Sequence, residues 1–262
     1  MARLTGLRSA VAVEWLKLRR SRVTLTASLA LLTLVPGATA LLHLGVGRGG
    51  SSPLAAKAAA LVPVAGPDGL LASAAQLSGG LTVLGVGIVM AWCVGREFQD
   101  GTVTGLFAQP TRRRDVALAK CVVLTGWAVV VCAGVALIVG LLGLATGLSA
   151  GECGRVVGRL AALGVLLTAG AFPATLVATV ARGVLAPVAV ILGLVVATQL
   201  AVGLGAGAWV PWAAGVLWAG GAGPQAAATV SPLQLGAVLA LAVASVAATV
   251  AAWDRLQLGR SR

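Results

Sequence analysis

The stretch "GREFQDGTVTGLFAQPTRRRDVALAK", residues 95–120, holds 8 of the chain's 26 charged residues (19 basic and 7 acidic). Long apolar runs precede and follow it. Of all 262 residues, 59% are hydrophobic and 10% are charged, whereas a soluble domain carries about 25% charged residues. The composition therefore predicts an all-α, polytopic membrane protein in which this charged stretch connects two membrane spans.

Six charge-free apolar runs are long enough to be spans, because a helix needs about 20 apolar residues to cross a bilayer. Pro211 and Pro224 lie between the last two runs and argue against a seventh span, so a re-entrant segment is predicted there. Together the runs predict a single transmembrane domain over residues 1–262. The runs cover residues 23–46, 74–95, 121–148, 160–181, 184–205 and 232–253.

Lys and Arg set the orientation of such a chain, because cytoplasmic loops carry an excess of them. With the N-terminus inside, 15 of the 19 basic residues fall on the inner side, which predicts cytoplasmic N- and C-termini. The net charge of +12 then reflects topology, and no nucleic acid partner is expected. The stretch "PGATA", residues 36–40, resembles a signal-peptide cleavage site, but the apolar run continues past it and favours an uncleaved first span.

The segment "LRSAVAVEWLKLRRSR", residues 7–22, precedes the first span. Leu7, Val11, Trp15 and Leu18 recur in it at helical spacing. Charged residues occupy much of the remainder: Arg8, Glu14, Lys17, Arg19 and Arg22. This pattern predicts a helix that lies in the membrane interface with its cations toward anionic headgroups. The alternative is a cytoplasmic tail whose charges serve topology alone.

Several kinds of chemistry lack their residues in this sequence. No Gly is followed by Lys, so a Walker A phosphate loop is absent and ATP and Mg are not expected to bind this chain. The four cysteines lack metal-ligand spacing and are predicted to be free thiols. No Asp, Glu, Lys or Arg falls inside a predicted span, which disfavours an ion-coupled carrier. Neither a catalytic site nor a metal site is expected, and the chain is predicted not to be an enzyme.

The charged stretch itself reads as a compact cytoplasmic elbow. Glu97 and Asp100 lie three residues apart, and Gly101 can adopt the left-handed conformation that ends a helix. Thr111 can cap a new helix that runs through Lys120. A loop that serves topology alone would need the arginines but not the acid pair or the Gly and Pro residues, so an elbow that transmits force to a partner is the favoured hypothesis.

The sequence resembles membrane subunits of the type-2 ABC permease superfamily, which are mostly exporters. The resemblance rests on "VEWLKLRRSR" (13–22), "EFQDGTVTGLFAQPTRRRDVALAK" (97–120) and "WVPWAAGVLW" (209–218). Members share a Glu-x-x-x-Gly-Thr pattern, then Pro-x-Arg and a Lys. With Asp100 added, the candidate residues for coupling to an ATPase are Glu97, Asp100, Gly101, Thr102, Pro110, Arg112 and Lys120.

The resemblance implies an ATP-driven exporter of the bacterial cytoplasmic membrane. A second permease copy, in a homodimer or heterodimer, and two copies of a separate ABC ATPase subunit are the implied partners, and the ATPase would bind ATP and Mg. Membrane lipids surround the assembly. The alternatives are a non-transport membrane scaffold or immunity protein and, less favoured, an ion-coupled carrier.

The resemblance also implies a transport path between two permease copies. A largely apolar path suits a hydrophobic or amphipathic cargo such as a drug, antibiotic, lipid or peptide. Each hydroxyl that could line the path has a simpler role, which is to bond back to a carbonyl of its own helix. The candidates for the path are Thr24, Thr26, Ser28, Thr33 and Thr39 on the first span, Ser73, Gln76, Ser78 and Thr82 on the second, and Thr198 and Gln199 on the fifth.

Overall fold

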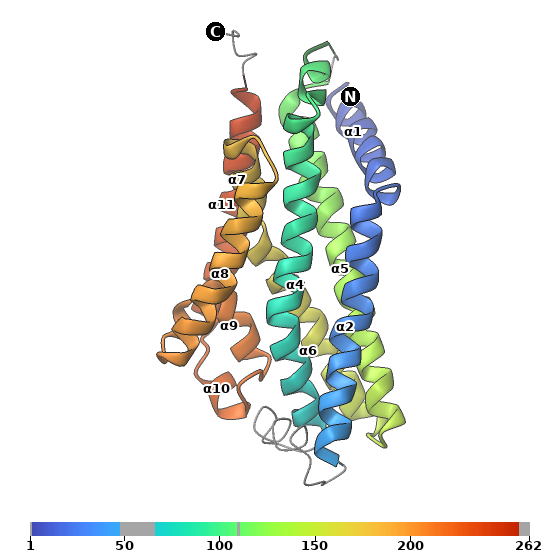
Figure 1. Cartoon of the computed structure of the whole chain (residues 1–262), viewed down its shortest axis with the longest axis vertical. Helices are drawn as coiled ribbons and strands as arrows, with labels where there is room; N and C mark the ends of the chain where they lie inside the picture. The colour runs from blue at the N-terminus through green and yellow to red at the C-terminus, as the bar shows by residue number, and fades with distance from the viewer. Residues whose placement is uncertain (1, 48–65, 109–110, 257–262) are drawn as a thin grey trace.

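The computed structural model of the chain describes residues 2–47, 66–108 and 111–256, and within these ranges it contains helices and no strand (Figure 1). The all-α prediction is confirmed. In chain order the α-helices are α1 (Ala2–Arg19), α2 (Arg22–Gly47), α4 (Gly66–Gln99), α5 (Arg113–Ala145), α6 (Ala150–Ala171), α7 (Pro173–Ala181), α8 (Leu185–Gly203), α9 (Pro211–Trp218), α10 (Pro224–Ala228) and α11 (Pro232–Asp254). Two 3₁₀ helices, η1 (Thr102–Ala108) and η2 (Gly207–Trp209), lie between them.

Six helical segments in the described part of the chain are long and apolar enough to cross a membrane, as predicted. They are α2, α4, α5, the pair α6 and α7, α8 and α11. Helix α4 begins at Gly66 rather than near residue 74, and α5 begins at Arg113 rather than at 121, so both helices extend beyond their apolar runs. The fourth span changes helix at Phe172, because Pro173 has no N–H to continue the ladder of α6.

Helix α4 is the centre of the bundle and packs against α2, α6, α7 and α8. Small residues allow close contacts: a Cβ on Gly95 would lie 2.5 Å from the carbonyl oxygen of Gly183, at the turn between α7 and α8. Helices α2, α8 and α11 lie at the periphery and leave many large apolar side chains exposed. The chain therefore offers wide apolar surfaces to its surroundings. That residues 1–262 form a single domain stays a prediction.

The two ends of the bundle differ in the segments they hold. Helix α1, η1 and the end of α11 lie together at one end in Figure 1, whereas α9 and α10 lie at the other. The segments predicted to share the inner side of the membrane are thus brought to one end. The predicted helix before the first span is confirmed as α1, which packs mainly against α5.

The buried face of α1 differs from the apolar face that the spacing of Leu7, Val11, Trp15 and Leu18 predicts. Ala10, Glu14 and Leu18 are buried against the bundle, while Trp15 and Leu16 are exposed. Trp15 thus lies off the face that carries Leu18, because the buried stripe follows the contact with α5 rather than the apolar spacing. The position of α1 in the membrane interface stays a prediction, and the exposed Trp15 suits it.

The segment between α8 and α11 contains short helices and no span. Its helix α9 is eight residues long and packs against α4, α6, α8 and α11. The indole N–H of Trp212 donates to the carbonyl oxygen of Gly170 at 2.8 Å. The segment is therefore supported by protein, as backbone at membrane depth must be. Its re-entrant path through a membrane stays a prediction.

Candidate functional site

The predicted elbow is a tight turn followed by a 3₁₀ helix. Helix α4 ends at Gln99, and Gly101 takes φ +67, so its predicted left-handed conformation is confirmed. The hydroxyl of Thr104 donates to the carbonyl oxygen of Gly101 at 2.6 Å. We call residues 100–112 the elbow. Asp100, Gly101 and Thr102 are exposed on it.

The second half of the elbow departs from the sequence prediction in one respect. Thr111 does not cap the next helix: Arg112 occupies the N-cap position with an extended backbone and no capping side chain, and α5 begins at Arg113. Asp115 in the first turn supplies a negative charge near the helix N-terminus instead. Arg112 is exposed, and Pro110 lies outside the described residues.

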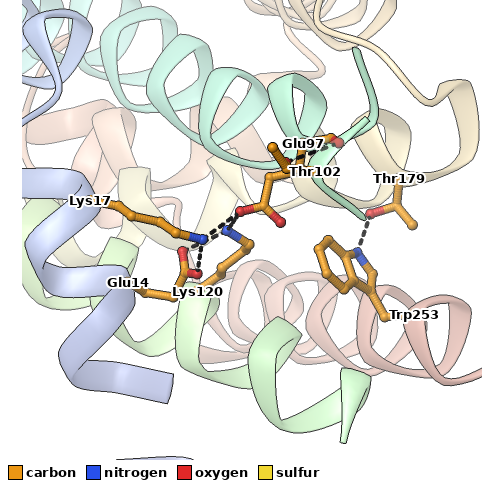
Figure 2. A network of polar contacts seen from close by, with 7 residues as sticks. All are labelled: Glu14, Lys17, Glu97, Thr102, Lys120, Thr179 and Trp253. Carbon is orange, nitrogen blue, oxygen red and sulfur yellow. Dashed lines mark hydrogen bonds and ion pairs between the residues drawn. The ribbon is translucent and has the colours of Figure 1, made fainter. Parts of the chain in front are cut away.

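Four ionic side chains from three helices meet beside the elbow (Figure 2). We call Glu14 and Lys17 of α1, Glu97 of α4 and Lys120 of α5 the ion cluster. The Lys120 ammonium lies 2.6 Å from Glu14 Oε2 and 2.7 Å from Glu97 Oε1. The Lys17 ammonium lies 2.9 Å from Glu14 Oε1 and 2.9 Å from Glu97 Oε1. Each lysine therefore bridges the same two carboxylates, and together they tie α1 to α4 and α5.

The ion cluster is neutral and largely buried. Two carboxylates balance two ammonium groups, and Glu97 and Lys120 are each only 4% exposed. Such charges are costly to remove from water, and close, charge-assisted hydrogen bonds offset that cost while every partner is present. Loss of one partner leaves an uncompensated buried charge. The cluster is thus a rigid junction whose members depend on one another.

The pKa of Lys17 reflects these contacts. Burial favours the neutral amine and by itself would lower the pKa of the Lys17 side chain. The charge of Glu97, together with the hydrogen bond to Glu14 and its charge, outweighs burial, so the pKa is raised above its ordinary value of 10.5. Lys17 is therefore firmly charged at neutral pH and holds α1 to the bundle.

One oxygen of the cluster lacks a partner in the described part of the chain. Glu97 Oε2 is buried and makes no hydrogen bond there, and in Figure 2 it points away from the lysines toward Trp253. The Lys120 ammonium lies 6.0 Å from the centre of a Trp253 ring, and the Trp253 indole donates to Thr179 Oγ1 at 3.0 Å. The end of α11 and helix α7 therefore adjoin the ion cluster.

Glu97 and Lys120 are among the predicted coupling residues, whereas Glu14 and Lys17 are not. The sequence pattern places Glu14 and Lys17 only among the charged residues of the first helix. One signal was available: Glu14 is the only acidic residue among the first 67, in a segment rich in Lys and Arg. An isolated acid in a basic helix has no role in topology, which makes a specific ionic partner the better interpretation.

The predicted path residues are spread over the bundle. Thr26, Thr33 and Thr198 each donate a hydrogen bond to a carbonyl of their own helix, which is the simpler role foreseen for them. Ser78 and Thr82 are buried inside the bundle.

A pocket between α4, α8 and α9 brings together Gln76, Thr198 and Gln199, with Trp212 on its wall. The structure thus joins three of the predicted path residues. The other eight candidates do not line that pocket: Thr24, Thr26, Ser28, Thr33, Thr39, Ser73, Ser78 and Thr82.

The remaining candidate chemistry is sparse within the described residues. Cys93, Cys121, Cys132 and Cys153 are free thiols, as predicted, and Cys153 is buried. No group of three or more His, Cys, Asp or Glu side chains that could hold a metal occurs in residues 2–47, 66–108 and 111–256.

The fold and the site define a six-span helical membrane protein with a charged elbow joined to a buried ion cluster. The sequence matches the family described as "ABC-2 family transporter protein" over residues 10–198, a range that includes the elbow and all four residues of the ion cluster. The chain belongs to this family, whose members are membrane components of transporters. No curated protein shows a significant sequence match to it.

Proposed function

We propose that this chain is the permease subunit of an ATP-driven exporter in a bacterial cytoplasmic membrane, with its elbow and both termini in the cytoplasm. Two copies of a separate ABC ATPase subunit bind ATP and Mg, and a second permease copy completes the path. The cargo is hydrophobic or amphipathic. The observation that carries the proposal is the connection between the exposed elbow and the ion cluster, which reaches three helices of the bundle.

The connection gives a route for force from a docked ATPase. Asp100, Gly101 and Thr102 are exposed at the turn, where a partner can contact them. The Thr102 hydroxyl donates to the backbone carbonyl of Glu97 at 3.3 Å, and the Glu97 carboxylate binds Lys17 and Lys120. A displacement of the elbow therefore reaches α1 and α5 through paired charges, and these pairs do not stretch without loss of stability.

The pocket between α4, α8 and α9 supports a path on the α8 face. Gln76 and Gln199 are exposed beside it, on helices long enough to span the membrane. Lipid chains offer no hydrogen bond to an amide, so glutamines on a lipid-facing surface are costly. A second permease copy, or cargo between two copies, would supply hydrogen-bond partners for these two amide groups. Exposed apolar side chains along α8, such as Leu192 and Leu200, would pack against the same second copy.

The ion-coupled carrier is the alternative to separate by experiment, because the ion cluster holds buried carboxylates. Its position disfavours that role: Glu97 lies two residues before the end of α4, at the elbow end of the bundle, whereas a carrier needs its exchanging group near mid-membrane. A scaffold or immunity protein has no evident use for the pocket with Gln76 and Gln199.

The decisive experiment is reconstitution in vesicles with candidate ABC ATPases from the same genome. We expect no ATP hydrolysis by the purified chain alone, hydrolysis by one ATPase that this chain stimulates, and transport that persists when a protonophore collapses the proton gradient. Transport driven by a proton gradient with this chain alone would overturn the proposal.

A labelling test of the chain's orientation in the membrane requires engineered cysteines, because the native Cys153 is buried and would react poorly with a thiol reagent. Gly105 lies on the elbow and Gly151 at the start of α6, and a Cβ at either position meets no atom within 4 Å. In intact cells a membrane-impermeant maleimide should label Gly151→Cys but not Gly105→Cys. The reverse pattern would place the elbow outside.

A further inference from the structure

An apolar groove runs between α5 and α11 on the surface of the bundle, toward the elbow end. It has a volume of about 710 Å³, within the range of small-molecule sites. Leu118 and Val122 of α5 and Val243, Val246 and Val250 of α11 line it. Val122 is 51% exposed and Val243 69% exposed. At membrane depth, hydrocarbon must cover these side chains.

The length of the groove matches one leaflet. Its lining on α11 runs from Ala242 to Asp254, which at a rise of about 1.5 Å per residue is roughly 18 Å. Half of the hydrocarbon core of a bilayer is about 15 Å. The groove therefore begins near the bilayer centre and ends at the level of the lipid headgroups.

Opposite charges stand at the headgroup end, one on each wall. Arg114 is in the first turn of α5, and Asp254 is the last residue of α11; both line the groove. The two walls are tied there, because the Arg113 guanidinium donates to the carbonyl oxygen of Leu256. Arg114 Nε lies 3.8 Å from Asp115 Oδ1, which is too long for a hydrogen bond. Among the described residues, the Arg114 guanidinium therefore keeps N–H donors for another acceptor.

We propose that this groove binds one phospholipid with a phosphoethanolamine headgroup, in the leaflet next to the elbow. An acyl chain lies along the valines, the phosphate meets the Arg114 guanidinium, and the primary ammonium donates to the Asp254 carboxylate. Guanidinium groups suit phosphate oxygens, and the carboxylate accepts hydrogen bonds from an ammonium. A choline headgroup has no N–H to donate, and an anionic glycerol headgroup leaves Asp254 without a cation.

Native mass spectrometry of the purified chain tests the site, with ethanolamine, choline and glycerol phospholipids of identical acyl chains as probes. We expect the ethanolamine lipid to be retained most strongly. Arg114→Gln should weaken retention of all three lipids, whereas Asp254→Asn should weaken that of the ethanolamine lipid alone, about threefold for the loss of an exposed ion pair. Equal retention of the ethanolamine and glycerol lipids by the unaltered chain would overturn the proposal.

A matched pair of variants locates the lipid. Ala247 lines the groove, whereas Ala244 is exposed on the same helix but does not line it. Ala247→Trp should displace the lipid and Ala244→Trp should not; equal effects would mean that the lipid binds elsewhere. The exposed Asp254 is replaceable without disturbing the core, so Asp254→Asn remains decisive if a Trp variant misfolds. The experiment needs no ATPase and no cargo, so its failure would leave the proposed transport function untouched.

Discussion

Helix α4 carries one acidic residue near each end, and the two are paired in opposite ways. Asp68, in the first turn, lies 3.9 Å from Arg155, and both side chains are more than half exposed. Glu97, in the last turn, lies within 3 Å of two lysines and is almost completely buried. Exposed pairs contribute little to stability, while buried pairs bind their elements together. The comparison identifies the elbow end, and not the opposite end, as the junction of the bundle.

The largest expected effect follows from removing one charge at each end. Lys120→Met leaves two buried carboxylates with one ammonium and should lower the free energy of unfolding in detergent by about 3–5 kcal/mol. Arg155→Met removes an exposed partner at the other end of α4 and should cost less than about 1 kcal/mol. Thermal unfolding of both purified variants measures the difference. Equal losses would remove the distinction between the two ends.

The next largest effect is a partial recovery of stability when a second charge of the ion cluster is removed. Glu97→Gln combined with Lys120→Met leaves Glu14 and Lys17 as a neutral pair. We expect the double variant to be more stable than the sum of the single losses predicts, by about 1–3 kcal/mol. The same denaturation experiments, arranged as a double-mutant cycle, give this coupling energy. Strict additivity would show that the four charges do not act as one cluster.

A third test separates stability from transport. Gly101 in the elbow and Gly147 after α5 both have positive φ, +67 and +91, and a Cβ at either meets no atom within 4 Å. Replacing either by Val should impose a similar backbone strain, roughly 1–2 kcal/mol. Gly101→Val should also lose most permease-stimulated ATP hydrolysis, because its turn leads to the docking surface, whereas Gly147→Val should keep it. Equal hydrolysis by both variants at equal expression would show that the elbow is a solvated loop.

The six spans and the turn at Gly101 could be predicted from the sequence, because each depends on local composition or on one residue's conformational freedom. The ion cluster could be predicted only in part. Glu97 and Lys120 are separated by the elbow, and their partners on α1 lie about 80 or more residues earlier in the chain. Spacing within one helix does not reveal which charges a tertiary contact will bury, so the sequence alone predicts that Glu14 and Lys17 lie on the surface.

The pocket with Gln76 and Gln199 shows the same limit. The sequence does not distinguish the polar residues of this pocket from the other candidates for the path, since any Ser or Thr in a span can donate a hydrogen bond to a carbonyl of its own helix. The packing of α9 against α4 and α8 sets three of them apart. That packing depends on a short, Pro-bounded segment whose path in three dimensions leaves no periodic signal.

The smallest effect concerns pH and the exposed edge of the ion cluster. The pKa of Lys17 is raised in the folded chain above its ordinary value of 10.5, so its contribution to stability is fully present below pH 10.5 and is lost as the pH rises through the folded value. Because the Lys17 side chain is 38% exposed, solvent screens its charge and the loss of stability should stay below about 1 kcal/mol.

Lys17→Arg is the matched control, since a guanidinium stays charged in this pH range. Wild type should lose stability relative to Lys17→Arg in detergent as the pH rises above 10.5, and the two should run parallel between pH 7 and 9. A constant difference across the whole range would mean that the ammonium of Lys17 adds nothing to the junction that Lys120 does not already supply.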